Sequence, residues 1–170
     1  MNGDFEFVKT KTQIRRLSDL ARAIWNEHFP PIIGQEQVDY MVCRFQSESA
    51  ISKQIRNEGY QYYFIPCDGK NVGFFAIRPD SDALFLSKIY ILHDYRGRGL
   101  ARVSFEFIED QCRLLKLPRI RLTVNRGNAR TVDIYRKIGF SIVRNQVVDI
   151  GGGFVMDDYV MEKPVPAKRD

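Results

Sequence analysis

The sequence is poor in the residues that build metal sites and disulfide frameworks. Its 170 residues include three cysteines and two histidines. Cys43, Cys67 and Cys112 are widely spaced, and only His28 and His93 could join them. Because a structural metal site needs closely spaced cysteine or histidine pairs, this composition argues against a metal centre. We expect buried or half-buried free thiols in a reducing compartment.

Long apolar runs are also missing. No stretch approaches the ~18 apolar residues that a helix needs to cross a membrane. The first residues lack the charged segment followed by an apolar segment that marks an export signal. The sequence therefore predicts a cytoplasmic protein without a membrane partner.

Charge of one sign is not missing, but its excess is modest. The net charge is +5, with 28% charged and 44% hydrophobic residues. A chain of this length and composition suits one domain with its own core, which we expect over residues 1–163, followed by a tail at 164–170. The positive balance is compatible with an anionic ligand, a nucleic acid or an acidic surface.

Hydrophobic periodicity predicts a mixed α/β domain in which helices flank a central mixed β-sheet in three layers. A weak strand at 4–9 precedes helices that begin near Thr12, near Gly34 and near residue 47. Further strands are expected at 60–67, 72–77, 83–92, 120–124, 140–150 and 154–161, with helices at 100–115 and 128–138. The strand–helix–strand segment from 83 to 124 should be a right-handed crossover between parallel strands.

The segment from Tyr95 to Ala101 reads YRGRGLA and connects a strand pattern to a helical one. Glycines let the backbone approach an anion, and the amides of a helix start point toward it. Arg96 and Arg98 add guanidinium groups, which match a diphosphate. This segment predicts a pyrophosphate site. The alternative is a tight turn with surface arginines.

A second motif lies between Asn125 and Phe140. Asn128 is suited to cap a helix, Val132 and Tyr135 share one helical face, and Gly139 suits the helix end. Taken alone, this motif fits a capped amphipathic helix with Tyr135 as a packing residue at least as well as a functional site.

Together the two motifs resemble the signatures of the GNAT N-acetyltransferases of the small bacterial type. Arg96-x-x-Gly99-x-Ala101 is similar to (Gln/Arg)-x-x-Gly-x-(Gly/Ala). Asn128, Tyr135 and Gly139-Phe140 match a second signature, Asn-x-x-Ala followed by Tyr-x-x-x-Gly-Phe. The resemblance covers about residues 60–162. His93 and Thr131 stand where the family commonly has proline and alanine.

The resemblance implies the acyl-CoA N-acyltransferase fold, with acetyl-CoA as co-substrate and no metal. Backbone amides of the turn would hold the pyrophosphate, the strand end would face the pantetheine arm, and Asn128 would face the cofactor. In this family that strand separates from its neighbour, here near Leu122 and Val124. The cofactor-binding residues so implied are Ile89, Tyr90, Ile91, Arg96, Gly97, Arg98, Gly99, Leu100, Ala101, Asn128 and Tyr135.

The same resemblance implies direct attack of an amine on the thioester. Tyr135 would donate a proton to the departing thiolate. Glu27 and His28, at the end of the first helix, are the predicted bases, and the alternative for both is a solvated helix end. Four acidic residues bracket the final hairpin, as an acidic mouth for the acceptor or as solvated hairpin ends. These residues are Asp149, Asp157, Asp158 and Glu162.

We therefore expect an N-acetyltransferase that acts on a primary amine of a small molecule, polyamine-like in character, or of a peptide. No nucleic-acid partner is expected. The sequence is compatible with a homodimer. Two alternatives are a nucleic-acid-binding module, supported by the arginines and the net charge, and a GNAT-fold CoA binder without catalysis.

Overall fold

The computed structural model of the chain describes residues 4–168, which form two compact units. Of the described residues, the first unit comprises 4–78 and Lys88–Phe105, and the second comprises Pro79–Ser87 and 106–168. The boundaries fall within one strand, β4, and one helix, α5, so these two elements contribute residues to both units.

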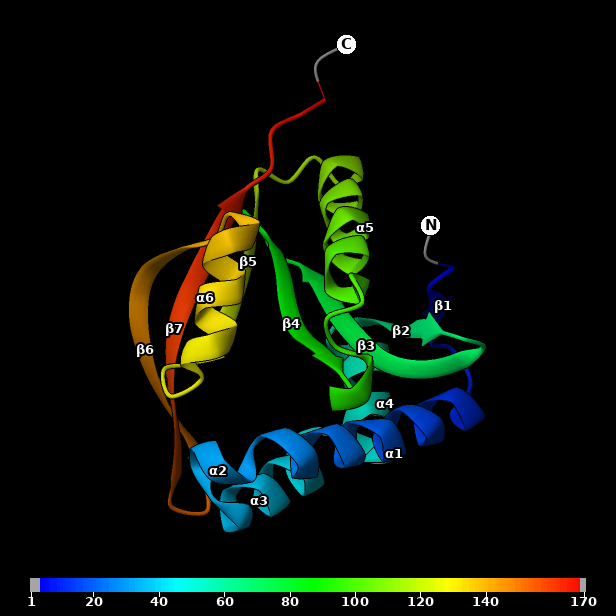
Figure 1. The fold of residues 1–170 in the computed structure, drawn as a ribbon, viewed down its shortest axis with the longest axis vertical. Helices are drawn as coiled ribbons and strands as arrows, with labels where there is room; N and C mark the ends of the chain where they lie inside the picture. Colours follow the sequence, from blue (N-terminus) through cyan, green and yellow to red (C-terminus); the bar gives the residue numbers. More distant parts are fainter. Residues whose placement is uncertain (1–3, 169–170) are drawn as a thin grey trace. The chain divides into compact units, whose positions relative to one another are not determined.

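The elements follow the predicted order (Figure 1). The helices are α1 (Lys11–His28), α2 (Pro30–Ile33), α3 (Gln35–Phe45), α4 (Glu48–Asn57), the 3-10 turn η1 (His93–Tyr95), α5 (Leu100–Leu114) and α6 (Ala129–Ile138). The strands are β1 (Glu6–Phe7), β2 (Gln61–Cys67), β3 (Lys70–Pro79), β4 (Leu84–Ile91), β5 (Arg119–Asn125), β6 (Ser141–Gly151) and β7 (Phe154–Pro164). The predicted mixed α/β class is confirmed.

The strands are ordered β1-β2-β3-β4-β5-β7-β6, so β4 occupies the predicted central position. β4 and β5 are parallel, as expected, with Leu84–Leu86 beside Ile120–Leu122. β2 and β3 form an antiparallel hairpin, and β7 is antiparallel to both β5 and β6. The sheet is therefore mixed.

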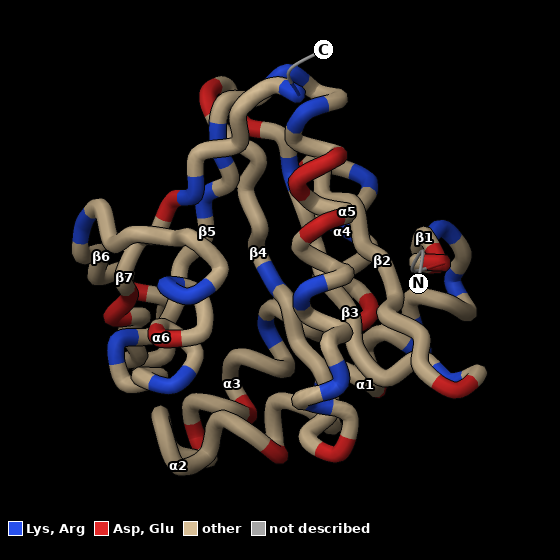
Figure 2. The backbone as a smooth tube through the Cα atoms, turned by 45° about the horizontal axis from the view of Figure 1, so that its top comes forward, with Lys and Arg blue, Asp and Glu red and all other residues tan. Residues whose placement is uncertain are grey.

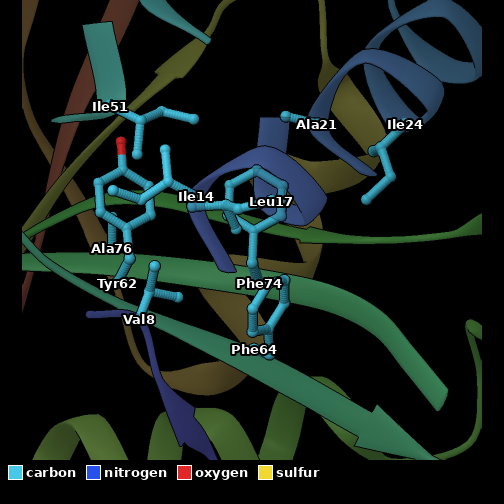
Figure 3. Packing of buried hydrophobic residues seen from close by; sticks show 10 residues of the cluster. All are labelled: Val8, Ile14, Leu17, Ala21, Ile24, Ile51, Tyr62, Phe64, Phe74 and Ala76. Atoms are coloured by element: carbon cyan, nitrogen blue, oxygen red, sulfur yellow. The ribbon is translucent and has the colours of Figure 1, made fainter. Parts of the chain in front are cut away.

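The core of the first unit lies between α1 and the β2–β3 hairpin (Figure 3). α1 begins with a capping box between Thr10 and Gln13, which satisfies amides at the helix start. Its buried side chains include Ile14, Leu17 and Ile24, which follow helical spacing. The whole cluster is Val8, Ile14, Leu17, Ala21, Ile24, Ile51, Tyr62, Phe64, Phe74 and Ala76.

The helix before Pro30 ends where the prolines predict, at His28, but a short helix that was not expected follows. α2 begins at Pro30 itself. Proline is tolerated at the first position of a helix, because the amide it lacks would have no partner within the helix there. Gly34, with a φ of 84°, separates α2 from α3.

In the second unit, α6 lies beside β5 and β7 (Figure 1). β5 alternates buried and half-buried residues, as its sequence predicts, with Ile120, Leu122 and Val124 buried. Val165, inside the predicted tail, is buried and donates its N–H to Pro118 O at 2.9 Å. The last tail residues, 169–170, lie outside the described residues.

The cysteine prediction holds in part. All three thiols are free, and Cys112 is buried and Cys67 half-buried, but Cys43 is exposed because it lies on the outer side of α3. Across residues 4–168, no three His, Cys, Asp or Glu side chains gather as a metal site would require. Within this part of the chain, no helix is both long enough and apolar enough to cross a membrane.

Candidate functional site

The turn between η1 and α5 has the backbone that an anion cradle requires. Gly97 and Gly99 adopt left-handed φ values of 74° and 79°. A Cβ at either position would meet no heavy atom within 4 Å, so glycine is needed for conformation and not for space. The Val103 amide donates to Gly99 O at 3.2 Å. The amides that come before Val103 at the start of α5 have no carbonyl partner within the helix, so they can donate to a ligand.

The arginines of this turn are turned back toward the protein. Arg96 donates from Nε to Ile91 O at 2.9 Å, and its Nη1 lies 3.4 Å from His28 Nδ1. Arg98 lies 3.3 Å from Asp68 Oδ2 and donates to Asp94 O. These contacts hold the turn to the end of β4 and to the β2–β3 hairpin. The two guanidinium groups therefore brace the turn, and their match to a diphosphate stays a prediction.

Both predicted bases contact residues next to this turn. Glu27 is exposed, and its Oε2 accepts the His93 N–H at 2.9 Å. His28 is half-buried beside Arg96 and meets the Phe29 ring edge-on. The C-terminal end of α1 is therefore joined to the segment that leads into the glycine turn.

The end of β4 is held closely by β3. A Cβ on Gly73 would lie 2.4 Å from Tyr90 O, so only glycine fits there. The Leu92 amide donates to Val72 O at 2.9 Å. Gly73 was missed in the sequence, because a lone glycine in a strand carries no signal of what approaches it.

Aromatic side chains also contact the Tyr90 ring. Trp25 and Phe29 stack with ring centroids 4.2 Å apart, and both meet the Tyr90 ring edge-on. This fixes the ring of one predicted cofactor residue against the end of α1.

Asn128 and Tyr135 lie in the second unit. Asn128 occupies the position before α6, but its side chain makes no capping bond, which corrects the capping prediction. The residue is buried, with 8% of its surface exposed, and its amide donates to Asn125 O at 2.9 Å. Gly139 ends α6 in the predicted left-handed conformation, with a φ of 113°.

The Tyr135 hydroxyl is set up to remain protonated. The ring is buried and lies 5.8 Å from the Phe140 ring, centroid to centroid. Burial raises the pKa of the hydroxyl above its ordinary value, because the charged phenolate is poorly solvated there. The hydroxyl therefore carries its proton at neutral pH.

The acidic residues of the final hairpin are mostly neutralised. Asp157 pairs with Arg126, with its Oδ1 3.4 Å from Nη1. Glu162 pairs with Arg121 at 2.8 Å and with Arg119 at 3.2 Å. Asp149 accepts the Gly151 amide at 2.8 Å. Basic and acidic residues are likewise interspersed along the chain of each unit (Figure 2).

The predicted residues are therefore divided between the units. The first unit brings Glu27, His28, the end of β4 and the glycine turn together through the contacts above, and the second holds Asn128 and Tyr135.

Comparisons with known proteins agree on one family. A model of the acetyltransferase (GNAT) family matches residues 18–140. An uncharacterized N-acetyltransferase of Mycobacterium tuberculosis is 28% identical over 133 residues, covering 78% of this chain and 85% of that protein. The spermidine N(1)-acetyltransferase of Escherichia coli K12 is 27% identical over 93 residues, which is 53% of this chain and 50% of that enzyme.

The fold has solved counterparts. The PaiA N-acetyltransferase of Thermoplasma acidophilum, crystallised with coenzyme A, superposes with a TM-score of 0.75 at 19% identity, covering 95% of this chain and 99% of that one.

Proposed function

The chain belongs to the GNAT acetyltransferase family, and from that premise we propose that it moves an acetyl group from acetyl-CoA to a primary amine. The observation that carries the proposal is the glycine turn at 96–99, which leads from β4 into the start of α5. Backbone amides at a helix start are a general way of binding phosphate.

Coenzyme A fits this turn chemically. Both glycines have open space beside their Cα atoms, where an anion can approach the backbone. The bonds from Arg96 to Ile91 and from Arg98 to Asp94 fix the turn before any ligand arrives, which lowers the entropic cost of binding. We propose that the amides of residues 97–101 and the main chain of Ile89–Ile91 bind coenzyme A. Asn128 is included because it belongs to the second family motif.

The thioester supplies the activated acyl group, and the chain's own residues handle protons. Tyr135 donates one to the sulfur that departs, a role supported by its place in the second motif and by its burial on α6. Glu27 and His28 stay predicted as bases. Their contacts with His93 and Arg96 also support a positioning role, in which they hold the segment that carries the turn.

The acceptor is proposed to be a small cationic amine. The match to a spermidine acetyltransferase over half of the chain supports a polyamine-like acceptor, and an amino group of a peptide is the alternative. The free thiols support a reducing, cytoplasmic location.

The proposal is tested with purified protein, acetyl-CoA and a panel of amines, following release of free thiol. The panel contains spermidine, spermine, a peptide with a free N-terminal alanine, a lysine-containing peptide blocked at its N-terminus, and free amino acids. We expect release that depends on the acceptor and is strongest with one class. Absence of release with every amine, together with no calorimetric heat from coenzyme A at millimolar concentration, would overturn the proposal.

A further inference from the structure

Some acidic residues of β7 form ion pairs with arginines, and one does not. Asp157 has Arg126, and Glu162 has Arg119 and Arg121. Asp158 lies between them in sequence, and within residues 4–168 its carboxylate has neither a cation nor a hydrogen-bond donor as partner. The negative charge of the Asp158 carboxylate is therefore not balanced by a neighbouring cation.

Asp158 is also the buried member of the group. It is 3% exposed, whereas the side chain of Asp157 is 49% exposed. Its register neighbours are Asn125 on β5 and Gln146 on β6, neither of which carries a charge. Burying an unpaired carboxylate costs free energy, so folding alone does not explain it. Such groups occur where a ligand or a reaction requires them.

Asp158 lies close to the start of the second motif in the second unit. Asn125, its partner in register, accepts the Asn128 amide at 2.9 Å and ends β5. Asp158 therefore lies at the end of β5 from which α6 begins with a predicted cofactor residue. Side chains alternate along β7, so Asp158 shares a face with Val160 and Glu162, while Lys163 lies on the other face and contacts Glu109 of α5. Lys163 also lies beside Gly139 at the end of α6, so Asp158 lies on the face of β7 opposite to α5 and α6.

We propose that Asp158 binds the amino group of the acceptor and takes the proton that this group loses. The inference rests on the proposed function and names Asp158 as the base in place of Glu27 and His28. As the nitrogen–carbon bond forms, the carbon–sulfur bond breaks and its electron pair leaves with sulfur. The bound ammonium group first gives one proton to the Asp158 carboxylate, which frees the lone pair that attacks the thioester carbon. The Tyr135 hydroxyl supplies the proton that sulfur receives, and the second proton that nitrogen loses returns to the Tyr135 oxygen through solvent. The acceptor class is a cationic primary amine, whose charge compensates the buried carboxylate.

The chemistry of the group agrees with this role. Burial, and secondly the Asp157 charge, raise the pKa of Asp158 to about 6. A carboxylate of this strength accepts a proton more readily than an ordinary one, yet remains mostly ionised near neutral pH. Glu27, by contrast, is exposed and already accepts the His93 amide.

The test compares Asp158→Asn with Asp110→Asn, the same change on an exposed aspartate of the second unit that pairs with Arg113. With acetyl-CoA and spermidine as probes, we expect Asp158→Asn to lower kcat/KM by about 100-fold or more. Asp110→Asn should stay within about threefold of the wild type, since it removes only an exposed ion pair. Asp158→Glu should recover part of the loss. Equal activity of Asp158→Asn and wild type would overturn the inference.

The thermal stability of Asp158→Asn shows whether a loss of activity comes from the missing carboxylate or from unfolding. Because the folded state raises the pKa of Asp158, its contribution to stability is present below the unfolded pKa and is lost as pH rises through about 6. Asp158→Asn should therefore have a higher Tm than wild type at pH 8, with a smaller difference at pH 4. A variant that is inactive and less stable at pH 8 would count against the inference.

A measurement that needs no turnover covers the case in which the proposed function itself fails. The carboxyl ¹³C resonance of Asp158, assigned by its absence in Asp158→Asn, should titrate near pH 6. Addition of spermidine should move that midpoint downward, because a bound cation favours the carboxylate. A midpoint near the ordinary value of about 4, or one that spermidine leaves in place, would overturn the inference whether or not acetyl-CoA binds.

Discussion

The Tyr135 hydroxyl illustrates how a single residue can keep a proton available. It is buried on α6, where the phenolate is disfavoured. If it protonates the departing sulfur, Tyr135→Phe should lower kcat by about 100-fold while changing the affinity for coenzyme A little. Thiol release and calorimetry measure the two quantities.

Tyr159→Phe is the matched control, because Tyr159 is a half-buried tyrosine of the same unit whose side chain points to the other face of β7 from Asp158. Its kcat should stay near that of the wild type. Unchanged kcat in Tyr135→Phe would remove Tyr135 from the mechanism and leave it as a packing partner of Phe140.

Residues of the same type take different roles for reasons that the sequence does not carry. Asp157 and Asp158 are adjacent and chemically identical, yet one is paired and exposed and the other is unpaired and buried. The difference comes from strand alternation and from the position of Arg126, and both require the folded sheet.

Among the elements, α3 and α4 are attached to the sheet of the first unit through one buried lysine. Lys88 on β4 donates to Gln54 Oε1 of α4 at 3.0 Å and to Phe45 O, the last carbonyl of α3, at 3.5 Å. It also donates to the Tyr62 hydroxyl of β2, which in turn donates to Gln54. Burial lowers the pKa of the Lys88 ammonium to about 7.

This lysine should make stability depend on pH. Its folded pKa of about 7 lies below the unfolded value, so the unfolded state binds more protons between about pH 7 and the unfolded value near 10.4. The free energy of unfolding should therefore rise over this window in the wild type, as far as Lys88 contributes.

Lys88→Met should reduce that rise, because it removes the group that titrates. Urea unfolding at pH 7 and at pH 9.5 measures it. Lys70→Met, in the exposed β2–β3 hairpin, should leave the slope unchanged. Identical slopes for wild type and Lys88→Met would show that the ammonium is not buried as described.

At the scale of the whole molecule, the net charge of +5 is compatible with two ligand classes, acetyl-CoA and nucleic acids. The effect of each ligand on the stability of the folded state distinguishes them. Acetyl-CoA at a hundredfold excess over its Kd should stabilise the folded state by about 2.7 kcal/mol, seen as a rise in Tm. A nucleic-acid binder would instead be stabilised by oligonucleotides, with a steep dependence on salt.

Gly99→Val tests whether the rise depends on the glycine turn. A β-branched side chain is strained at a φ of 79°, so the amides of the turn should move and the effect of acetyl-CoA should shrink. A full rise in Tm with the variant would place the phosphate site elsewhere. Stabilisation by oligonucleotides and not by acetyl-CoA would favour the alternative function.

The sequence by itself determined the order of the elements, the parallel pairing of β4 with β5 and the two family motifs. Those features follow from local preferences: apolar periodicity, the glycines at 97, 99 and 139, and the prolines after α1. Tertiary structure alone decided how Arg96 braces the turn, why position 73 must be glycine, what surrounds Lys88, and which acidic residue of β7 has no partner. Burial and charge pairing depend on residues far apart in the chain, such as Lys88 and Gln54, and only folding brings them together.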